Sequence, residues 1–225
     1  MIFVTGDTHG EVDITHIGNK AWPEQKSLTK DDILIIAGDF GFVWKNDRCD
    51  LYWRKWLDNR RFTTLFIDGN HENFDLLEEF PVVEKFDAKL QQISRHVFHV
   101  CRGEVLNING TKIWCMGGAK SHDRQYRKEH VSWWPQETPT NEEMQYAYAN
   151  LLKNDLRVDF LITHCAASSV QNLIDLHYDR TPFTDFLDKV DSSVTFKHWY
   201  FGHYHRDVKL TSQYTCVYKD VIQIA

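Results

Sequence analysis

Short runs of β-branched and aromatic residues recur along the chain and predict strands. Several of these runs are apolar at every position instead of every second one, which is typical of strands covered on both faces. The runs span residues 1–5, 33–38, 64–69, 104–108, 112–118, 159–164 and 196–202. We therefore expect buried β-structure at the centre of the molecule.

Helical patterns separate some of the predicted strands. Thr140 followed by Glu143 predicts a capping box for a helix that begins there, and Thr181 with Pro182 is typical of the start of another helix. An earlier helix is predicted where apolar side chains gather near one helical face. These side chains are Leu51, Trp53, Trp56, Leu57 and Phe62.

Two segments in the second half of the chain favour strand pairs. Residues 104–118 predict a hairpin that turns at "NING", and residues 214–224 predict a second pair. No internal repeat and no Gly/Ser-rich linker divides the sequence. The mixture of early helices and later hairpins indicates an α/β chain, which we expect to form one domain over residues 1–225.

The composition supports a globular protein outside the membrane. The chain has 225 residues, of which 42% are hydrophobic and 26% charged. An apolar run such as Ile33–Gly38 is far too short to span a bilayer. The start, "MIFVTGD", lacks the basic region of a signal peptide, so we expect no secretory leader.

Cysteine usage and net charge narrow the setting and the partners. Five cysteines without C-x-x-C spacing indicate free thiols, and we expect a cytoplasmic protein. A net charge of −6 disfavours, but does not exclude, long nucleic acid as a partner. Nothing in the sequence indicates the oligomeric state.

Asp, His or Asn residues follow five of the predicted strands. Each short motif alone is ordinary turn chemistry, but their joint occurrence at strand ends favours a ligand site, because ligands bind at that edge of open α/β sheets. The residues are Asp7 and His9, Asp39, Asn70 and His71, His164, and His203 and His205. Imidazole and carboxylate ligands without thiolates suit Mn²⁺, Fe or Zn²⁺.

The order of these motifs resembles the calcineurin-like metallophosphoesterase superfamily, with the bacterial and phage members as the nearest likeness. The signature D-x-H, G-D, G-N-H-E, a lone His and G-H-x-H stands here in sequence from Asp7 to His205. The resemblance implies a two-sheet β-sandwich flanked by helices, with four layers in the order α/β/β/α. It also implies two divalent metal ions at the strand ends.

The resemblance also assigns the ligands. Asp39 bridges the two ions, because a carboxylate offers two oxygens. Asp7, His9 and His205 complete one site, and Asn70, His164 and His203 complete the other. We expect Mn²⁺ first, with Fe and Zn²⁺ as alternatives. Two divalent ions against two carboxylates leave a positive surface for a phosphate.

His71 is the expected general acid, which protonates the leaving alkoxide. The alternative is that it only hydrogen-bonds a phosphate oxygen. Many relatives carry G-D-x-x-D, in which the second aspartate orients this histidine. Here Phe42 stands in that place, so the sequence leaves open what orients His71.

A basic and aromatic segment at residues 117–140 is expected to form a loop near the active site. Lys120, Arg124 and Arg127 are candidate substrate contacts. Trp133 and Trp134 either close the pocket over the substrate or anchor a solvated loop in the core.

These features together predict an enzyme. We expect it to hydrolyse phosphomonoesters or small phosphodiesters through attack by a metal-bridged hydroxide, with His71 as the acid. One alternative is a non-catalytic metal-binding interaction scaffold on the same fold. The other is a metal-dependent nuclease.

Overall fold

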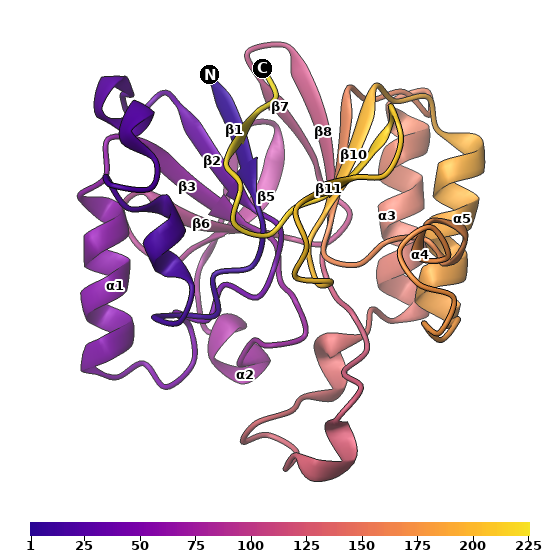
Figure 1. Cartoon of the computed structure of the whole chain (residues 1–225), viewed down its shortest axis with the longest axis horizontal. Helices are drawn as coiled ribbons and strands as arrows, with labels where there is room; N and C mark the ends of the chain where they lie inside the picture. The colour runs from indigo at the N-terminus through magenta and orange to yellow at the C-terminus, as the bar shows by residue number, and fades with distance from the viewer.

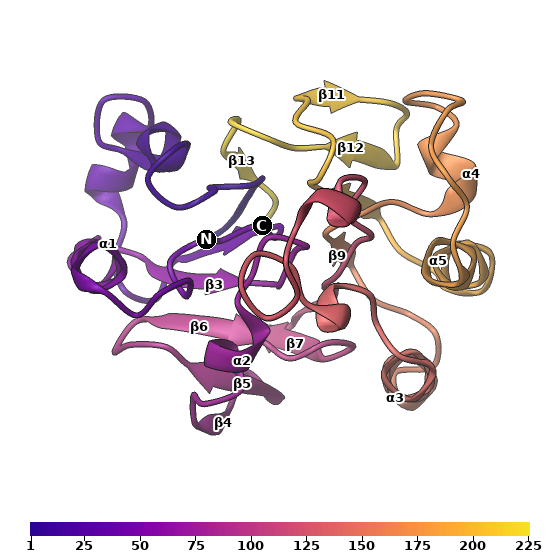
Figure 2. The ribbon, with the colours of Figure 1, turned by 90° about the horizontal axis from the view of Figure 1, so that it is seen from below.

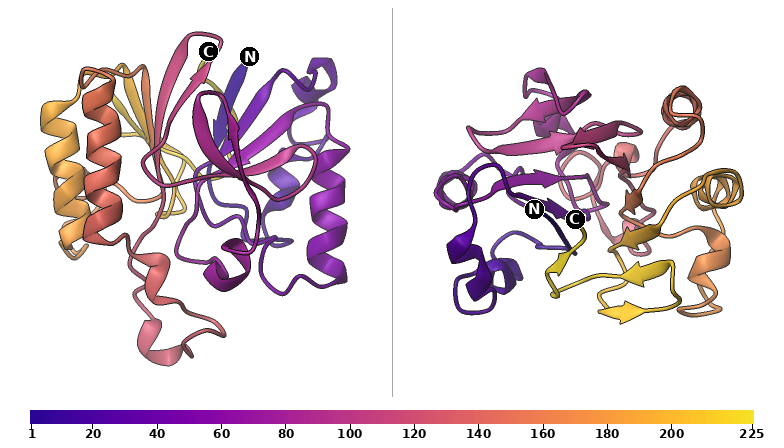
Figure 3. Two further views of the ribbon diagram at one scale, coloured as in Figure 1. Left: turned by 180° about the vertical axis from the view of Figure 1, so that it is seen from behind. Right: turned by 90° about the horizontal axis from the view of Figure 1, so that it is seen from above.

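Two β-sheets pack face to face between layers of helices in the computed structural model, which describes residues 1–225 (Figure 1). The helix α1 (Arg48–Asp58) covers the outer face of one sheet. The helices α3 (Asn141–Lys153) and α5 (Pro182–Ser193) cover the outer face of the other, as the views from behind and above also show (Figure 3). The predicted α/β/β/α sandwich is confirmed.

The first sheet has seven strands in the order β13-β1-β2-β3-β6-β5-β4. Its central four strands are parallel, and its two edges are antiparallel. The strands are β1 (Ile2–Thr5), β2 (Ile33–Ile36), β3 (Thr63–Phe66), β4 (Val82–Lys85), β5 (Ala88–Gln92), β6 (Val97–Val100) and β13 (Ile222–Gln223).

The second sheet has six strands in the order β11-β12-β10-β9-β8-β7. Strands β8, β9, β10 and β12 run parallel, with β7 and β11 antiparallel at the edges. The strands are β7 (Val105–Ile108), β8 (Thr111–Met116), β9 (Phe160–Thr163), β10 (His198–Phe201), β11 (Val208–Lys209) and β12 (Tyr214–Cys216).

The remaining helices are short. They are α2 (Phe74–Leu77), α4 (Ser168–Gln171) and the 3₁₀ helices Ile14–Ile17, Pro23–Ser27, Arg124–Tyr126 and Pro135–Glu137. Both predicted helix starts are confirmed, because Thr140 and Glu143 form a capping box and Thr181 caps α5 with Pro182 in its first turn. None of the helices is long and apolar enough to cross a membrane.

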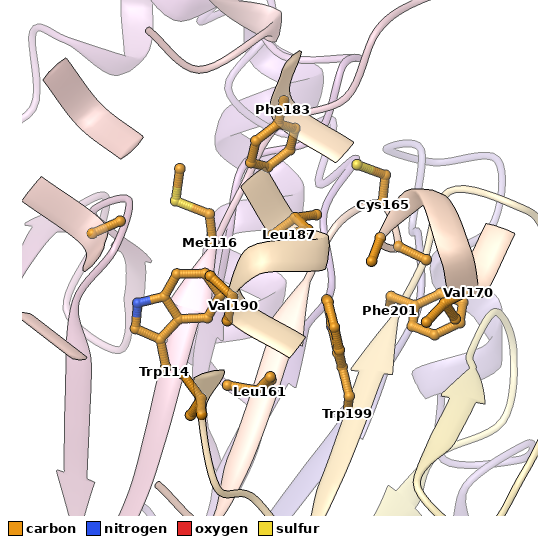
Figure 4. Packing of buried hydrophobic residues seen from close by; sticks show 14 of the residues in the cluster. Trp114, Met116, Leu161, Cys165, Val170, Phe183, Leu187, Val190, Trp199 and Phe201 are labelled. Atoms are coloured by element: carbon orange, nitrogen blue, oxygen red, sulfur yellow. The ribbon is translucent and has the colours of Figure 1, made fainter. Parts of the chain in front are cut away.

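Three layers of apolar side chains hold the four layers of the fold together. One layer fills the space between the sheets and includes Ile35 and Ile162. A second packs α1 and the early 3₁₀ helices against the first sheet. The third packs α3 and α5 against the second sheet, where Trp114, Leu161 and Trp199 meet Leu187 (Figure 4). Because both faces of each sheet are covered, β2 is apolar at every position and all four residues of β9 are buried.

The structure confirms one of the two predicted strand pairs and contradicts the other, and it corrects the predicted buried face of α1. The hairpin at 104–118 is confirmed, with a two-residue turn in which Asn109 and Gly110 both have positive φ. The strands within 214–224 do not pair with each other. Instead, β12 joins β10 in the second sheet and β13 joins β1 in the first. Leu51 does not belong to the buried face of α1, because its side chain is exposed.

The loops that follow the parallel strands all emerge at one end of the sandwich. In Figure 1 this is the lower end, opposite the two termini. The segment 117–140 hangs below it, and Figure 2, viewed from below, shows that segment in front of the strand ends. The fold therefore brings the predicted site residues to one place.

Candidate metal centre and active site

Four of the predicted ligands form a tight cluster at the ends of β1, β2 and β10. The ligand atoms of Asp7, His9, Asp39 and His205 all lie within 4.8 Å of one another. His205 Nε2 lies 3.2 Å from Asp7 Oδ2. We call the set of Asp7, His9 and His205 the solvent-facing half, because the His205 side chain is 51% exposed.

The other three predicted ligands lie on the far side of Asp39. His164 Nε2 is 3.1 Å from Asn70 Oδ1, and the rings of His164 and His203 have centroids 5.0 Å apart. Asn70 and His164 are buried. We call the set of Asn70, His164 and His203 the inner half.

Asp39 lies between the two halves, with one carboxylate oxygen toward each. Its Oδ2 is 3.3 Å from His9 Nε2, and its Oδ1 is 3.4 Å from His164 Nε2. This is the position that a bridging carboxylate requires. Asp39 therefore contacts a predicted ligand of each half.

The distances and hydrogen bonds fit a pair of metal ions. Two donor atoms about 2.1 Å from a shared ion, at right angles to each other, lie about 3 Å apart. The separations in both halves run from 3.1 to 3.4 Å. His164 Nδ1 donates to the Ala37 carbonyl and His9 Nδ1 contacts the Asp13 carboxylate. Each Nε2 is thereby left to face the cluster, as metal-ligating histidines require.

The cluster is also built to hold positive charge. Burial opposes protonation of the two imidazoles, but Asp39 and Asp7 reverse this effect. They raise the pKa of His9 to about 9 and that of His164 to about 10. Burial likewise opposes ionisation of Asp39, yet its pKa is held well below the usual range, chiefly by His164. Neither Asp7 nor Asp39 forms an ion pair with Lys or Arg, so divalent cations fit the donor set.

The backbone at this site is held in an uncommon conformation. His9, Asp39, His203 and His205 all have positive φ, between 42° and 70°. Left-handed backbone costs energy in residues other than glycine and is concentrated at functional sites. Glycines make room for the ligands: a Cβ at Gly69 would lie 2.0 Å from Asp39 Oδ1, and one at Gly202 would lie 2.2 Å from Asp7 Oδ1.

Two acidic residues support the site without having been predicted. Asp13 contacts His9 Nδ1 at 2.9 Å and accepts from the hydroxyl of Tyr218, whose ring stacks on His205. Glu72 is buried and accepts from the Phe40 N–H at 2.7 Å. Burial, with the nearby charge of Asp39, raises the pKa of Glu72 to about 8. The spacing from His9 to Asp13 and the Glu of "GNHE" were available signals in the sequence.

His71 lies at the rim of the cluster and contacts an arginine. Its backbone N–H donates to Asp39 Oδ1 at 2.8 Å, and Arg127 Nη1 lies 3.1 Å from its Nδ1. Burial, together with the charge of Arg127, lowers the pKa of His71 although Asp39 opposes this. Phe42, in place of the second aspartate, is buried against Phe40 and Trp53. A cation, and not a carboxylate, therefore stands next to this histidine.

A cavity of about 390 Å³ opens beside His71 and His9. Phe42, Trp44 and Lys45 contribute to its wall. Because both histidines line it, the cavity opens directly beside the cluster.

The other two candidate substrate contacts interact with neighbouring side chains of the protein. Lys120 pairs with Asp179 at 3.5 Å and lines a cavity of about 20 Å³ beside His203. The Arg124 guanidinium lies over the Trp133 ring, 5.7 Å from its centroid.

The two tryptophans of the segment differ. Trp134 is buried and donates to Asp75, so it anchors the loop and does not close the pocket. Trp133 is half-buried.

Comparison with known proteins decides the family. A family model described as calcineurin-like phosphoesterase matches residues 1–207. The chain belongs to this family. Calcineurin-like phosphoesterases are typically hydrolases of phosphate esters with two metal ions, and the cluster of this chain fits that chemistry.

One curated relative of this chain is lariat debranching enzyme A from Xenopus laevis. The two sequences are 30% identical in an alignment of 145 positions that covers 57% of this chain and 25% of the relative. The match thus spans about a quarter of the length of that protein.

Proposed function

We propose that this protein is a dinuclear metal-dependent phosphoesterase that hydrolyses phosphomonoesters or small phosphodiesters. The observation that carries the proposal is the position of Asp39, whose two oxygens face histidines of both halves. Two divalent ions bound there would supply charge that holds a phosphate and the activated water that attacks phosphorus.

In this proposal, different residues hold the metal ions and orient the ligands. Asp39 holds the two halves at a fixed separation, and the buried carbonyl of Ala37 and the carboxylate of Asp13 keep the imidazoles oriented. The positive φ of four of these residues supports a site whose side chains the fold holds in place before any substrate arrives. Such a rigid arrangement is what stabilises charge in a transition state.

His71 is the residue that delivers a proton to the leaving oxygen. Arg127 contacts both ring nitrogens of His71, with Nη1 3.1 Å from Nδ1 and Nη2 3.3 Å from Nε2, and so holds the ring in place beside the cluster. The leaving alcohol would occupy the 390 Å³ cavity that His71 lines. Arg127, placed beside His71, is the candidate for binding a phosphate oxygen.

The metal and the compartment follow from the ligand set and the thiols. Nitrogen and oxygen ligands favour Mn²⁺, with Fe or Zn²⁺ as alternatives. All five cysteines are free, three of them buried, which suits a reducing compartment such as the cytoplasm.

A metal-dependent nuclease is the second candidate, because the relative is named for debranching lariats. The net charge of −6 disfavours the binding of long nucleic acid. A non-catalytic scaffold is disfavoured, since neither the cluster nor His71 has been lost.

The test is a hydrolysis assay with an aryl phosphate monoester, an aryl phosphate diester and a branched oligonucleotide. Each is supplied to the protein with Mn²⁺ and again after chelation. We expect turnover of an aryl ester that chelation abolishes and Mn²⁺ restores. Cleavage of the oligonucleotide alone would favour the nuclease, and no turnover with metal bound would favour the scaffold.

A further inference from the structure

Three buried side chains form a hydrogen-bonded chain that ends on a predicted metal ligand. Ser121 Oγ donates to Glu137 Oε2 at 2.6 Å, and the Ser121 backbone N–H donates to Glu137 Oε1 at 2.9 Å. Asn70 Nδ2 donates to Ser121 Oγ at 3.1 Å. The three residues are between 1% and 5% exposed, so water does not compete for these bonds.

The direction of this chain is fixed by chemistry. The Glu137 carboxylate can only accept, so the single hydroxyl hydrogen of Ser121 is committed to it. Ser121 Oγ is then an acceptor toward Asn70, and only the amide nitrogen of Asn70 can satisfy it.

The consequence reaches the metal cluster. With Nδ2 turned to Ser121, the Asn70 oxygen faces His164 Nε2 at 3.1 Å. His164 donates through Nδ1 to Ala37, so Nε2 is the nitrogen that offers a lone pair there once a cation displaces its proton. Two lone-pair donors that close to each other suit a shared cation. The reversed amide would point hydrogen atoms at that cation.

We propose that Ser121 and Glu137 are positioning residues for the inner metal ion, because they set the orientation of the Asn70 amide. This inference rests on the proposed function. It assigns a second role to segment 117–140, whose base supplies both residues: the segment completes the metal site as well as lying near the substrate.

A purely structural role is the competing explanation. The same residues join the two ends of the segment, since the Ala119 N–H donates to the Glu137 carbonyl at 2.9 Å. If that were all, removing the Ser121 hydroxyl would change stability or loop order and leave metal binding as it was. The positioning role therefore predicts a change in metal affinity, whereas the structural role predicts a change only in stability or loop order.

The experiment is a Mn²⁺ titration of metal-stripped protein, followed by calorimetry and by electron paramagnetic resonance, which distinguishes a coupled Mn²⁺ pair from an isolated ion. Wild-type protein should bind two ions and show the coupled signal. Ser121→Ala should bind one ion normally and the second about 10–100-fold more weakly, with an isolated-ion signal at limiting metal. Ser192→Ala, in the last turn of α5, is the matched control and should behave as wild type.

A substitution at the ligand separates orientation from packing. Asn70→Asp presents an oxygen in either orientation, so Ser121→Ala in that background should weaken the second ion less than about threefold. An equally large loss in both backgrounds would overturn the positioning role.

Glu137→Gln gives an independent reading if Ser121→Ala does not fold. The amide has one oxygen for the two Ser121 donors, so the second ion should again bind more weakly. Two ions bound with wild-type affinity in both variants would overturn the inference and leave the proposed function standing. A wild-type protein that binds no second ion would overturn both.

Discussion

The two halves of the metal cluster differ in exposure and in what holds them. In the solvent-facing half, His205 is 51% exposed and His9 18% exposed at the side chain, and Asp13 with Tyr218 supports them. In the inner half, His164 is fully buried, and a backbone carbonyl orients it. The inner half is thus fixed by the core, whereas the solvent-facing half depends on side chains that solvent can reach.

This difference implies two kinds of metal site that share Asp39. The inner ion should exchange slowly, because its ligands cannot move without disturbing buried contacts. The solvent-facing ion should exchange faster. Substitutions in one half, or at Asp39, which both halves share, test whether the two metal sites differ in this way.

The largest effect is expected from Asp39→Asn. An amide offers one oxygen and no negative charge, so the halves lose both their bridge and the shared charge that holds the ions, and both ions should bind much more weakly. Hydrolysis should fall more than about 100-fold, since even residues outside the ligand shell contribute 10–100-fold. Elemental analysis and an aryl phosphate assay measure both effects, with Asp31→Asn on the surface as control. Loss of only one ion would contradict the bridging position.

His71→Ala should reduce turnover about 10²–10⁴-fold and keep both metal ions. In the proposed mechanism the histidine delivers a proton and binds no metal, so its loss should remove the general acid without opening either half. Turnover and bound metal are measured on the same sample, and His177→Ala, an exposed histidine, serves as control. Unchanged turnover would end the acid assignment.

Asp68→Asn should destabilise the protein by up to about 3–5 kcal/mol, because it breaks the buried ion pair with Arg102 and leaves Glu143 as the only charged partner of that guanidinium. Asp68 receives two hydrogen bonds from Arg102, which also binds Glu143 and the Gln136 carbonyl. This network joins the end of β3 to segment 117–140, and so supports the inner half. Urea unfolding measures the change, and a loss below 1 kcal/mol would show that the network is dispensable.

The same carboxylate predicts a loss of stability in acid. Burial opposes its charge, but Arg102 and His99 hold the pKa of Asp68 well below the usual value. A lowered pKa means that the stabilisation is complete above about pH 4, the ordinary aspartate value, and is lost as pH falls toward the folded pKa. The acid unfolding curve of Asp68→Asn should therefore be flatter than that of the wild type.

Asp13→Asn should give the smallest and most local effect. It removes the carboxylate that orients His9, so the solvent-facing ion should bind about 10–100-fold more weakly while the inner ion is unaffected. Mn²⁺ titration resolves the two affinities. Weakening of both ions to the same degree would contradict the separation of the halves.

The sequence predicts the site better than it predicts the support around it. Predicted ligands such as Asp39 and His203 directly follow a glycine at the end of a strand, so short motifs indicate them. Ser121 lies 51 residues from Asn70, and no local pattern indicates that contact. Arg127 reaches His71 over 56 residues for the same reason, although its place in a basic segment was a hint.

The fold, too, could be predicted from the sequence only in part. Fully buried strands such as β2 are evident from their composition. The edge strand β4 is largely exposed and has little apolar pattern, so it could not be predicted. Pairing between distant segments, such as β13 with β1, depends on the closed sandwich and is not encoded within either segment.

The central claim is that two metal ions share Asp39 in one buried cluster. The most direct test is a crystal structure of the protein grown with Mn²⁺, with anomalous scattering recorded to locate the metal. The account predicts two anomalous peaks about 3.5–4 Å apart, one on each side of the Asp39 carboxylate. A single peak, or two peaks that do not share Asp39, would contradict it.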